Sequence, residues 1–429
     1  MRYLSICSGI ESATVAWHPL GWEPVAFAEI DPFPCAVLHH HYGSGRPLRM
    51  PDPDAPGIDA AEKRRRRAAI KGVAYLPEKP ALNGVPNLGD FTQIQSSDLR
   101  SDIDLLVGGT PCQDFSVAGL RAGLDGDRGN LSLEFLRLAQ RTRPRWLVWE
   151  DVPGVLSSNG GRDFGAILGG MVELGYGFAY RVLDAQFIRV DGYARAVPQR
   201  RRRVFVVGHL GDWRRAAAVL FERACLSGHP APRREAGESV AATLAARSGG
   251  GGHPDGGDGR HSHLIAFSSK DHGADAMVGV SPTLRAMNHD GSHANAGGQI
   301  AVAFDTTPAH GHAPAIALGV ALRGREEGAT AELTGDVMTA LRCGGGGGDK
   351  PHVLQDAPGA QEAWRVRRLM PVECERLQGF PDGYTDVPYR RRNATPDGPR
   401  YKALGNSKAV NVVRWVGMRI AEVDQLPSR

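Results

Sequence analysis

Residues 103–112 read Ile-Asp-Leu-Leu-Val-Gly-Gly-Thr-Pro-Cys, a short apolar run that ends in a proline–cysteine pair. The aliphatic and β-branched residues predict a buried strand. The two glycines and the proline then predict a sharp turn, which puts Cys112 on a loop at the carboxyl end of the strand, where ligands bind in open α/β sheets. A lone cysteine is usually a small buried hydrophobe. The rigid proline before this one favours an exposed, positioned thiol, and we interpret Cys112 as a nucleophile.

Similar apolar runs, separated by helical stretches, recur over residues 1 to about 208. They cover residues 3–6, 24–28, 146–149 and 203–207. This alternation predicts an α/β fold, with a mostly parallel sheet covered by helices on both faces. Residues 43–87 form an insertion punctuated by prolines. It contains one basic helix, residues 59–71, for which Asp59 and Glu62 predict an N-terminal cap.

The chain changes character after residue 208. Residues 248–350 contain 22 of the 55 glycines, with few aromatic residues and no long amphipathic period. This pattern predicts short strands joined by long loops, in a smaller, irregular and β-rich domain that spans residues 209–396. Regular structure then returns with a helix over 371–378 and a buried helix from residue 409. We expect residues 397–429 to complete the first domain, residues 1–208.

The composition restricts the kinds of partner and site. The net charge of the 429 residues is only +4, but the arginines cluster at 64–67, 200–203 and 390–392, which favours contacts to the phosphates of a nucleic acid. Six scattered cysteines without a C-x-x-C pair indicate neither a disulfide framework nor a zinc site. No apolar stretch has the length of a membrane span, and no signal-peptide pattern is present. We therefore expect a cytoplasmic protein with no metal and no membrane.

Nine motifs between residue 3 and about residue 416 resemble, in the same order, those of the DNA (cytosine-5)-methyltransferases, particularly the solitary bacterial and phage forms. The motifs are Tyr3-Leu-Ser-Ile-Cys-Ser-Gly9-Ile-Glu, Glu29-Ile-Asp31, Gly89-Asp90, Pro111-Cys112, Gly129-Asn-Leu131, Glu150-Asp-Val152, Val197-Pro-Gln-Arg-Arg-Arg-Arg203, the run from Arg368 to Pro381, and Tyr401 with Gly405-Asn-Ser407. Each is a weak signal alone. Together they imply a Rossmann-like catalytic domain that binds S-adenosylmethionine, and a smaller target-recognition domain.

The resemblance also implies which residues hold S-adenosylmethionine, the methyl donor. Glu29 corresponds to the ribose contact and Asp90 to the adenine contact. The full set is Cys7, Ser8, Gly9, Ile10, Glu29, Ile30, Asp90, Phe91, Pro111, Leu131, Asn406 and Ser407.

The chemistry of cytosine agrees with the implied catalytic residues. Carbon 5 is too electron-poor to attack a sulfonium methyl group until a thiolate, here Cys112, adds at carbon 6. A thiol with a reference pKa of about 8.5 needs a positive field, for which Arg201 and Arg203 are candidates. Glu150 can donate a proton to ring nitrogen 3, and Arg203 or its neighbour can hold oxygen 2. The base must be flipped out of the duplex, and Gln113, Gln199, Arg201 and Arg203 are expected to contact the DNA.

Three positions depart from the family pattern. The glycine loop has Glu11-Ser12 in place of a second glycine, so it is not a tight phosphate cradle, and S-adenosylmethionine has no phosphate. Asp151 and Asp184 stand where the family has asparagine. These changes alter local hydrogen bonding and leave Cys112 and Glu150 in place.

Two alternative functions remain open from the sequence. One is a cytosine-5 methyltransferase that acts on RNA, and the other is a non-catalytic DNA-binding relative. The bulk of residues 209–360 suits the reading of double-stranded DNA, and Cys112, Glu150 and Arg203 are all present. Amino-group methyltransferases carry an Asp/Asn-Pro-Pro-aromatic tetrapeptide, which this sequence lacks. We expect a monomer that acts on double-stranded DNA, with a cognate restriction endonuclease as a candidate partner.

Overall fold

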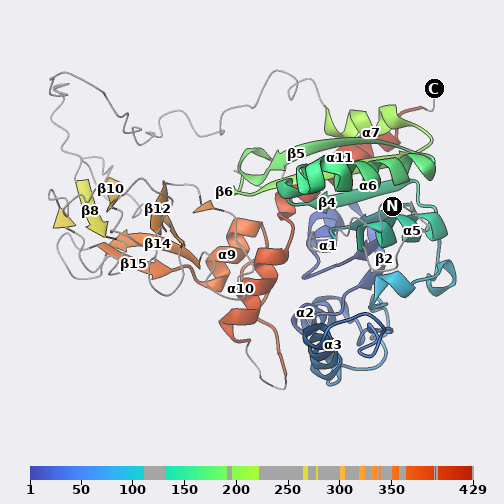
Figure 1. Cartoon of the computed structure of the whole chain (residues 1–429), viewed down its shortest axis with the longest axis horizontal. Helices are drawn as coiled ribbons and strands as arrows, with labels where there is room; N and C mark the ends of the chain where they lie inside the picture. Colours follow the sequence, from blue (N-terminus) through green and yellow to red (C-terminus); the bar gives the residue numbers. More distant parts are fainter. Residues whose placement is uncertain are drawn as a thin grey trace. The chain divides into compact units, whose positions relative to one another are not determined.

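The computed structural model describes residues 1–110, 131–190, 196–221, 369–390, 392 and 395–427 in full, and between residues 264 and 368 it describes the backbone of eight strands. The chain forms two compact units (Figure 1). The first comprises residues 1–232 and 371–429, and the second comprises residues 233–370.

Six strands form the sheet of the first unit, in the order β2-β1-β3-β4-β7-β5. Strands β2, β1, β3 and β4 are parallel, and β7 is antiparallel to both β4 and β5. The strands are β1 (Arg2–Ile6), β2 (Glu23–Ala28), β3 (Leu105–Gly108), β4 (Trp146–Asp151), β5 (Tyr176–Asp184) and β7 (Arg202–Leu210). The predicted mostly parallel sheet is confirmed. Because β2 and β3 lie on opposite sides of β1, the strand order reverses at the β1–β3 boundary, which is where α/β sheets bind ligands.

Helices cover this sheet on both faces, as the sequence predicts. One set packs with alternate strand residues such as Leu106, Leu147 and Val206, and comprises α5 (Leu131–Thr142) and α6 (Arg162–Glu173). The other set comprises α1 (Ser12–Trp17), α7 (Trp213–Leu220) and α11 (Val410–Asp424), and α11 contacts the other two. The Trp17 indole joins the two ends of the chain, since its Nε1 donates to the Val413 carbonyl at 2.8 Å.

The helix of the insertion, α3 (Ala60–Val73), packs against α2 (Pro32–Tyr42), which precedes the insertion (Figure 1). Cys35, Val73 and Leu76 are the buried apolar residues of this contact. The predicted cap of α3 is confirmed, because the Asp59 carboxylate accepts a hydrogen bond from the Glu62 amide at 2.7 Å.

The first unit extends past the domain boundaries expected at residues 208 and 396. It includes α7, which packs on β5 and β7, together with α9 (Pro371–Gln378) and α10 (Asp397–Asn406). On the C-terminal side, α9 belongs to the first unit because of the fully buried Glu375 carboxylate. It accepts hydrogen bonds from the amides of Gly383 and Thr385 at 2.7 and 2.8 Å and pairs with Arg400 at 3.1 Å. These contacts tie α9 to the segment that follows it and to α10.

Every element described in the second unit is a strand, as expected for a β-rich domain. Three strands pair in the order β10-β8-β9 and four in the order β12-β11-β14-β15, all antiparallel. The eight strands described in this unit, of which β13 belongs to neither of these two sheets, are β8 (Leu264–Ser268), β9 (Met277–Val278), β10 (Ile300–Phe304), β11 (Leu318–Arg323), β12 (Thr330–Gly335), β13 (Met338–Thr339), β14 (Lys350–Asp356) and β15 (Trp364–Arg368).

The remaining short elements belong to the first unit. They are β6 (Gln199–Arg200) and the 3-10 helices η1 (His18–Leu20), η2 (Phe91–Gln93), η3 (Ser96–Asp98), η6 (Pro153–Leu156), η7 (Ser158–Gly161) and η8 (Ala185–Phe187). Across the described part of the chain, none of the helices has the length and apolar character needed to cross a membrane.

Candidate active site

The predicted site residues gather at the carboxyl ends of the parallel strands. The Cys7–Ile10 loop follows β1, Glu29 and Ile30 follow β2, and Glu150 lies near the end of β4. Pro111, Cys112 and Gln113 lie outside the described residues, so their predicted roles remain predictions. Leu131 is the first residue of α5 and packs against the sheet core.

The loop after β1 has an unusual backbone. Cys7, Gly9 and Glu11 have φ angles of 44°, 58° and 62°, in the left-handed region that costs L-residues about 1 kcal/mol or more. The Ser8 hydroxyl holds the loop to the sheet, since it donates to the Ser5 carbonyl at 2.9 Å and accepts from the Ala28 amide at 3.1 Å. A Cβ atom on Gly9 would meet nothing within 4 Å, so the backbone is open above this residue.

The Glu29 carboxylate is fixed by backbone amides. Its Oε2 accepts from Gly9 at 2.7 Å, and its Oε1 accepts from Ile30 and Asp31 at 2.8 and 2.7 Å. Burial raises its pKa above the ordinary value, although these amides oppose the shift. The acid is therefore held in one place between the loops that follow β1 and β2.

Asn87, which no sequence motif marks, connects this corner to the segment before η2. Its side chain accepts from the Glu29 amide and donates to the Glu29 carbonyl, both at 3.0 Å, and it also accepts from the Gly89 amide at 3.0 Å. Asp90 then caps η2 by accepting from the Thr92 amide at 3.1 Å. Phe91 is only 5% exposed and belongs to the core, so its side chain supports the site from beneath.

Glu11, where the family pattern has glycine, is fully buried and caps α1. Its carboxylate accepts from the Ser5 hydroxyl at 2.8 Å and from the Thr14 amide at 3.0 Å. Burial raises its pKa to about 7, while these hydrogen bonds and the positive charge of Lys408 oppose the shift. The side chain thus compensates in part for a backbone conformation that suits glycine.

The two glycines after β3 serve close approach, whereas the sequence predicted that they bend the chain. Neither Gly108 nor Gly109 has a positive φ. A Cβ on Gly108 would lie 2.4 Å from the Ile6 side chain, and one on Gly109 would lie 2.8 Å from Glu150 Oε2. Glycine is needed here because β3 approaches β1 and the Glu150 carboxyl so closely.

The base of the segment that contains Cys112 is well anchored. The Thr110 hydroxyl lies 2.7 Å from the Ser132 hydroxyl and accepts from the Trp149 indole at 3.0 Å. The last residue before Pro111 is therefore tied both to β4 and to the start of α5.

Glu150 and Arg203 form an ion pair at this end of the sheet. The distance from Arg203 Nε to Glu150 Oε1 is 3.1 Å, and the two side chains are only 16% and 11% exposed. They meet because β7 runs antiparallel to β4, so that β7 starts where β4 ends. The fold thus brings together Glu150 and Arg203, which the motifs predicted separately and which lie 53 residues apart in the sequence.

Arg201 lies in the interior and holds the C-terminal segment. It is 2% exposed, and its Nη2 donates to the carbonyls of Gly405, at 3.0 Å, and Ser407. Its amide donates to Asp184 Oδ1 at 3.1 Å. Gln199 is fully buried, and within the described structure no hydrogen-bond partner is found for its side-chain amide.

The segment held by Arg201 leads to a buried lysine that the sequence analysis did not single out. Asn406 is exposed, Ser407 is buried, and Lys408 is 9% exposed at the start of α11. The Ser407 hydroxyl donates to the Lys408 carbonyl at 3.1 Å. Tyr384 fixes the loop after β1 from the same part of the chain, since its hydroxyl donates to the Ile10 carbonyl at 2.9 Å. Neither residue carries a local signal, because each role depends on packing between distant segments.

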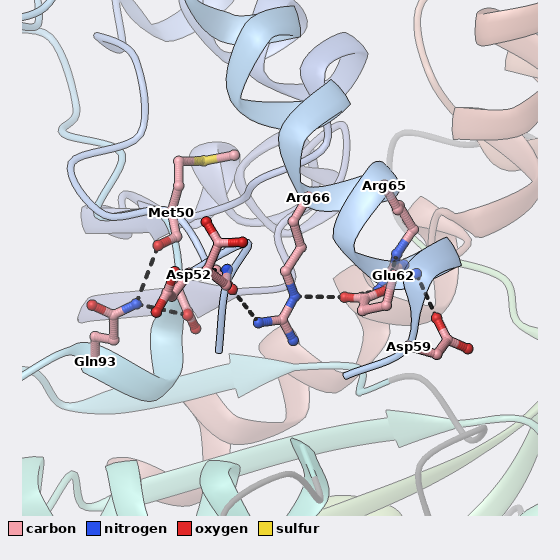
Figure 2. Close-up of polar contacts among 9 residues, drawn as sticks. Met50, Asp52, Asp59, Glu62, Arg65, Arg66 and Gln93 are labelled. Atoms are coloured by element: carbon pink, nitrogen blue, oxygen red, sulfur yellow. Dashed lines mark hydrogen bonds and ion pairs between the residues drawn. The ribbon is translucent and has the colours of Figure 1, made fainter. Parts of the chain in front are cut away.

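Figure 2 shows two arginines of the first run, Arg65 and Arg66, engaged within the insertion. Arg65 and Arg66 both pair with Glu62, at 2.6 and 2.7 Å, and Arg66 also donates to the Asp52 carbonyl at 2.8 Å. Arg67 pairs with Asp54 at 2.7 Å. These neighbours hold the pKa of Glu62 down at about 2.

The described cysteines do not have the properties of a nucleophile. Burial raises the pKa of Cys7 to about 12, and it raises that of Cys35 as well. Both thiols are therefore neutral at physiological pH. In the part of the chain that is described, no group of three or more His, Cys, Asp or Glu side chains could hold a metal ion.

Comparisons with known proteins relate this chain to DNA methyltransferases. A family profile described as C-5 cytosine-specific DNA methylase matches residues 81–242 and 327–422. A DNA N-6-adenine-methyltransferase of Escherichia phage P1 is 32% identical over 517 residues, covering 98% of this chain and 61% of the phage protein. The Type II methyltransferase M2.BsuMI of Bacillus subtilis is 23% identical over 428 residues, covering 98% of this chain and 76% of that protein.

A solved structure extends the likeness to the fold. The crystal structure of the S. pombe Dnmt2 methyltransferase matches with a TM-score of 0.50 and 14% identity, covering 99% of this chain and all of that one. At this identity the likeness concerns the fold alone.

Proposed function

The chain belongs to the family of C-5 cytosine-specific DNA methylases, and we propose that it transfers a methyl group from S-adenosylmethionine to carbon 5 of cytosine in a specific sequence of duplex DNA. The observation that carries the proposal is the shielded Glu150–Arg203 pair, 3.1 Å apart, beside the base of the segment that contains Cys112. A carboxyl group beside a guanidinium matches the ring nitrogen 3 and oxygen 2 of a cytosine.

The residues at the β1 and β2 ends fit S-adenosylmethionine. The Glu29 carboxylate is an acceptor suited to ribose hydroxyls, and the open backbone at Gly9 leaves room for a ligand. Asp90 is the candidate contact to the adenine, next to the η2 segment that Asn87 ties to Glu29. When bound, S-adenosylmethionine supplies a methyl group on a positive sulfur, an electrophile for carbon 5.

The chain's own residues account for the rest of the reaction. In the proposed sequence the Cys112 thiolate forms a bond to carbon 6, and the electron pair of the 5,6 double bond becomes available at carbon 5. Glu150 holds a proton at ring nitrogen 3 and disperses the negative charge, while Arg203 keeps the carboxyl oriented. After methylation, loss of the carbon 5 proton to water expels the thiolate and restores the double bond.

The target base is buried in the duplex, so the proposal includes base flipping at a cost of a few kcal/mol. Sequence reading is proposed for the β-rich second unit, residues 233–370, since the residues assigned to the chemistry lie outside it. The exposed Arg200 and Arg202 are candidates for phosphate contacts that hold the opened duplex.

A second activity is suggested by the printed name of the phage P1 relative, adenine N-6 methylation, and this chain covers 61% of that protein. An amino-group methyltransferase positions its target with an Asp/Asn-Pro-Pro-aromatic tetrapeptide, and the present sequence has none. We therefore favour cytosine as the target base.

Product analysis tests the proposal directly. The full chain is incubated with S-adenosylmethionine labelled in the methyl group and with either mixed-sequence duplex DNA or transfer RNA, and the nucleic acid is digested to nucleosides. We expect label in 5-methyldeoxycytidine from DNA. Label in N6-methyldeoxyadenosine, or in the transfer RNA alone, would contradict the proposal, as would an absence of transfer to both.

A further inference from the structure

Lys408 is a buried cation whose partner is missing from the described structure. The residue is 9% exposed, and among the described residues no hydrogen bond or ion pair is found for its ammonium group. The nearby carboxylates are engaged elsewhere: Glu11 with Ser5 and Thr14, and Glu150 with Arg203.

The side chain reaches into the candidate active site. A Cβ atom on Gly109 would lie 3.4 Å from Lys408 Cε and 2.8 Å from Glu150 Oε2. The positive charge of Lys408 also lowers the pKa of Cys7 and of Glu11, both in the loop after β1. The ammonium group therefore lies between the β1 loop and the end of β3, at the point where the strand order reverses.

A lysine that is 9% exposed and has no partner for its charge packs less well than an apolar side chain of similar size. Such a residue is explained when a ligand supplies the missing anion. The phosphates of duplex DNA are poor candidates, because they lie on the outside of the duplex and most of the Lys408 residue is shielded from solvent.

The charges of the methyl donor identify a better candidate. At neutral pH its sulfonium and amino groups are positive, and its only negative group is the carboxylate of the methionine portion. The sheet order β2-β1-β3-β4 puts Glu29 and Asp90, the candidate adenosine contacts, on one side and Glu150, where methyl transfer is proposed, on the other. The methionine portion then extends toward β3 and β4, where Lys408 lies.

We propose that the Lys408 ammonium binds the carboxylate of the methionine portion of S-adenosylmethionine. This inference rests on the proposed function, because it requires that the donor binds at the ends of β1 and β3. It assigns a donor-binding role to a residue just beyond the Asn406-Ser407 motif.

A ligand series tests the pairing by isothermal titration calorimetry on the full chain, without any measurement of activity. The ligands are S-adenosylhomocysteine, its decarboxylated analogue and 5′-methylthioadenosine, which lacks the whole amino-acid arm. The proteins are the unmodified chain, Lys408→Met, Lys408→Arg and the matched control Lys71→Met, which removes an exposed lysine of α3.

We expect Lys408→Met to weaken S-adenosylhomocysteine binding by about 10- to 100-fold, the range for a charge-assisted hydrogen bond, and to leave the other two ligands within about 2-fold. Lys408→Arg should restore part of the loss, and Lys71→Met should change nothing. The melting temperature of Lys408→Met without ligand should equal or exceed that of the unmodified chain, which shows that the variant folds.

Two results would overturn the inference. Equal weakening of all three ligands would mean that Lys408 only supports the fold of the site, and unchanged affinity for all three would mean that the carboxylate binds elsewhere. If the unmodified chain bound none of the ligands, the proposed function itself would fail, which is a distinguishable outcome.

Discussion

Two arginine runs in this molecule have similar sequences and different roles. Arg200–Arg203 spans β6 and the start of β7, and burial alternates along it: Arg201 is 2% exposed, whereas Arg200 and Arg202 are exposed. Arg64–Arg67 lies on α3, where the side chains remain at the surface or pair with Glu62 and Asp54. A strand turns alternate residues inward, whereas this helix lies at the surface and has only its last turn buried.

The comparison teaches that an arginine run alone does not identify a phosphate-binding surface. Both runs contain arginine–carboxylate pairs at about 3 Å, yet only the Glu150–Arg203 pair is shielded from solvent at a sheet end that holds other site residues. The surrounding elements therefore decide what each pair can do, and the following experiments compare the two regions.

The largest difference is expected between the two paired acids. Glu150→Gln should lower turnover by about 10² to 10⁴, the usual range for loss of a general acid. Glu62→Gln, the matched change on α3, should leave turnover within about 2-fold, because Glu62 pairs only within the insertion. Methyl transfer to DNA under saturating donor measures both. Equal effects would mean that shielding at the sheet end has no bearing on catalysis.

A second difference is expected in stability. Arg201→Met removes the donor to the Gly405 and Ser407 carbonyls and should cost about 3 kcal/mol of unfolding free energy, since two buried acceptors lose a charged partner. Arg66→Met should cost at most about 1 kcal/mol, as is usual for a partly exposed pair. Urea denaturation of both variants gives the values. A larger loss for Arg66 would reverse our interpretation of the two runs.

Two carboxylates, Glu11 at the candidate site and Glu62 on α3, should differ in how their contribution to stability depends on pH. Burial raises the pKa of Glu11 to about 7, so above that pH its charge destabilises the fold by up to about 3 kcal/mol, and this cost disappears as pH falls toward the unfolded value of 4.5. The unmodified chain should therefore gain stability relative to Glu11→Gln as the pH falls from 8 to 5.

Glu62 is the control for that experiment. Its pKa is lowered to about 2 by Arg65 and Arg66, so its contribution is complete above 4.5 and lost only in acid. The difference between Glu62→Gln and the unmodified chain should be flat from pH 5 to pH 8. A flat response at Glu11 would contradict its raised pKa.

The smallest effect is expected inside the active-site region itself. Asp151→Asn should change turnover by less than about 3-fold, because the asparagine carbonyl can still accept from the Val152 amide, as Asp151 Oδ1 does at 2.6 Å. Comparison with Glu150→Gln in the same assay shows whether the two neighbours differ. If Asp151→Asn were the more damaging change, we would have assigned the acid to the wrong residue.

Much of the fold could be predicted from local patterns. The runs at 3–6, 24–28 and 146–149 are apolar enough to indicate buried strands, and helix 371–378 is delimited by Pro371 and Gly379. Strand β5 was missed, because an edge strand with only three buried residues and a glycine at its second position has a weak pattern. Helices α6 and α7 were missed as well.

The candidate site could be predicted only in part. Motif resemblance indicated Glu150 and Arg203, but their pairing depends on the antiparallel direction of β7, which an apolar run does not reveal. Asn87 and Lys408 act across 58 and about 300 residues of sequence, so no local pattern marks them. The same is true of Arg201, for which burial and the carbonyl partners are visible only in the folded chain.

Covalent catalysis at cytosine by Cys112 can be tested with DNA in which 5-fluorodeoxycytidine replaces deoxycytidine. Fluorine at carbon 5 cannot leave as a cation, so the adduct formed after methylation should persist. PCR fragments made with the fluorinated nucleotide include many sequences, so the recognition site need not be known.

With S-adenosylmethionine present, the unmodified chain should give a protein–DNA band that survives denaturing electrophoresis, and Cys112→Ser should give none. Unsubstituted DNA is the control and should leave no band with either protein. An active enzyme that formed no such band on fluorinated DNA, or a band that persisted in Cys112→Ser, would contradict the account.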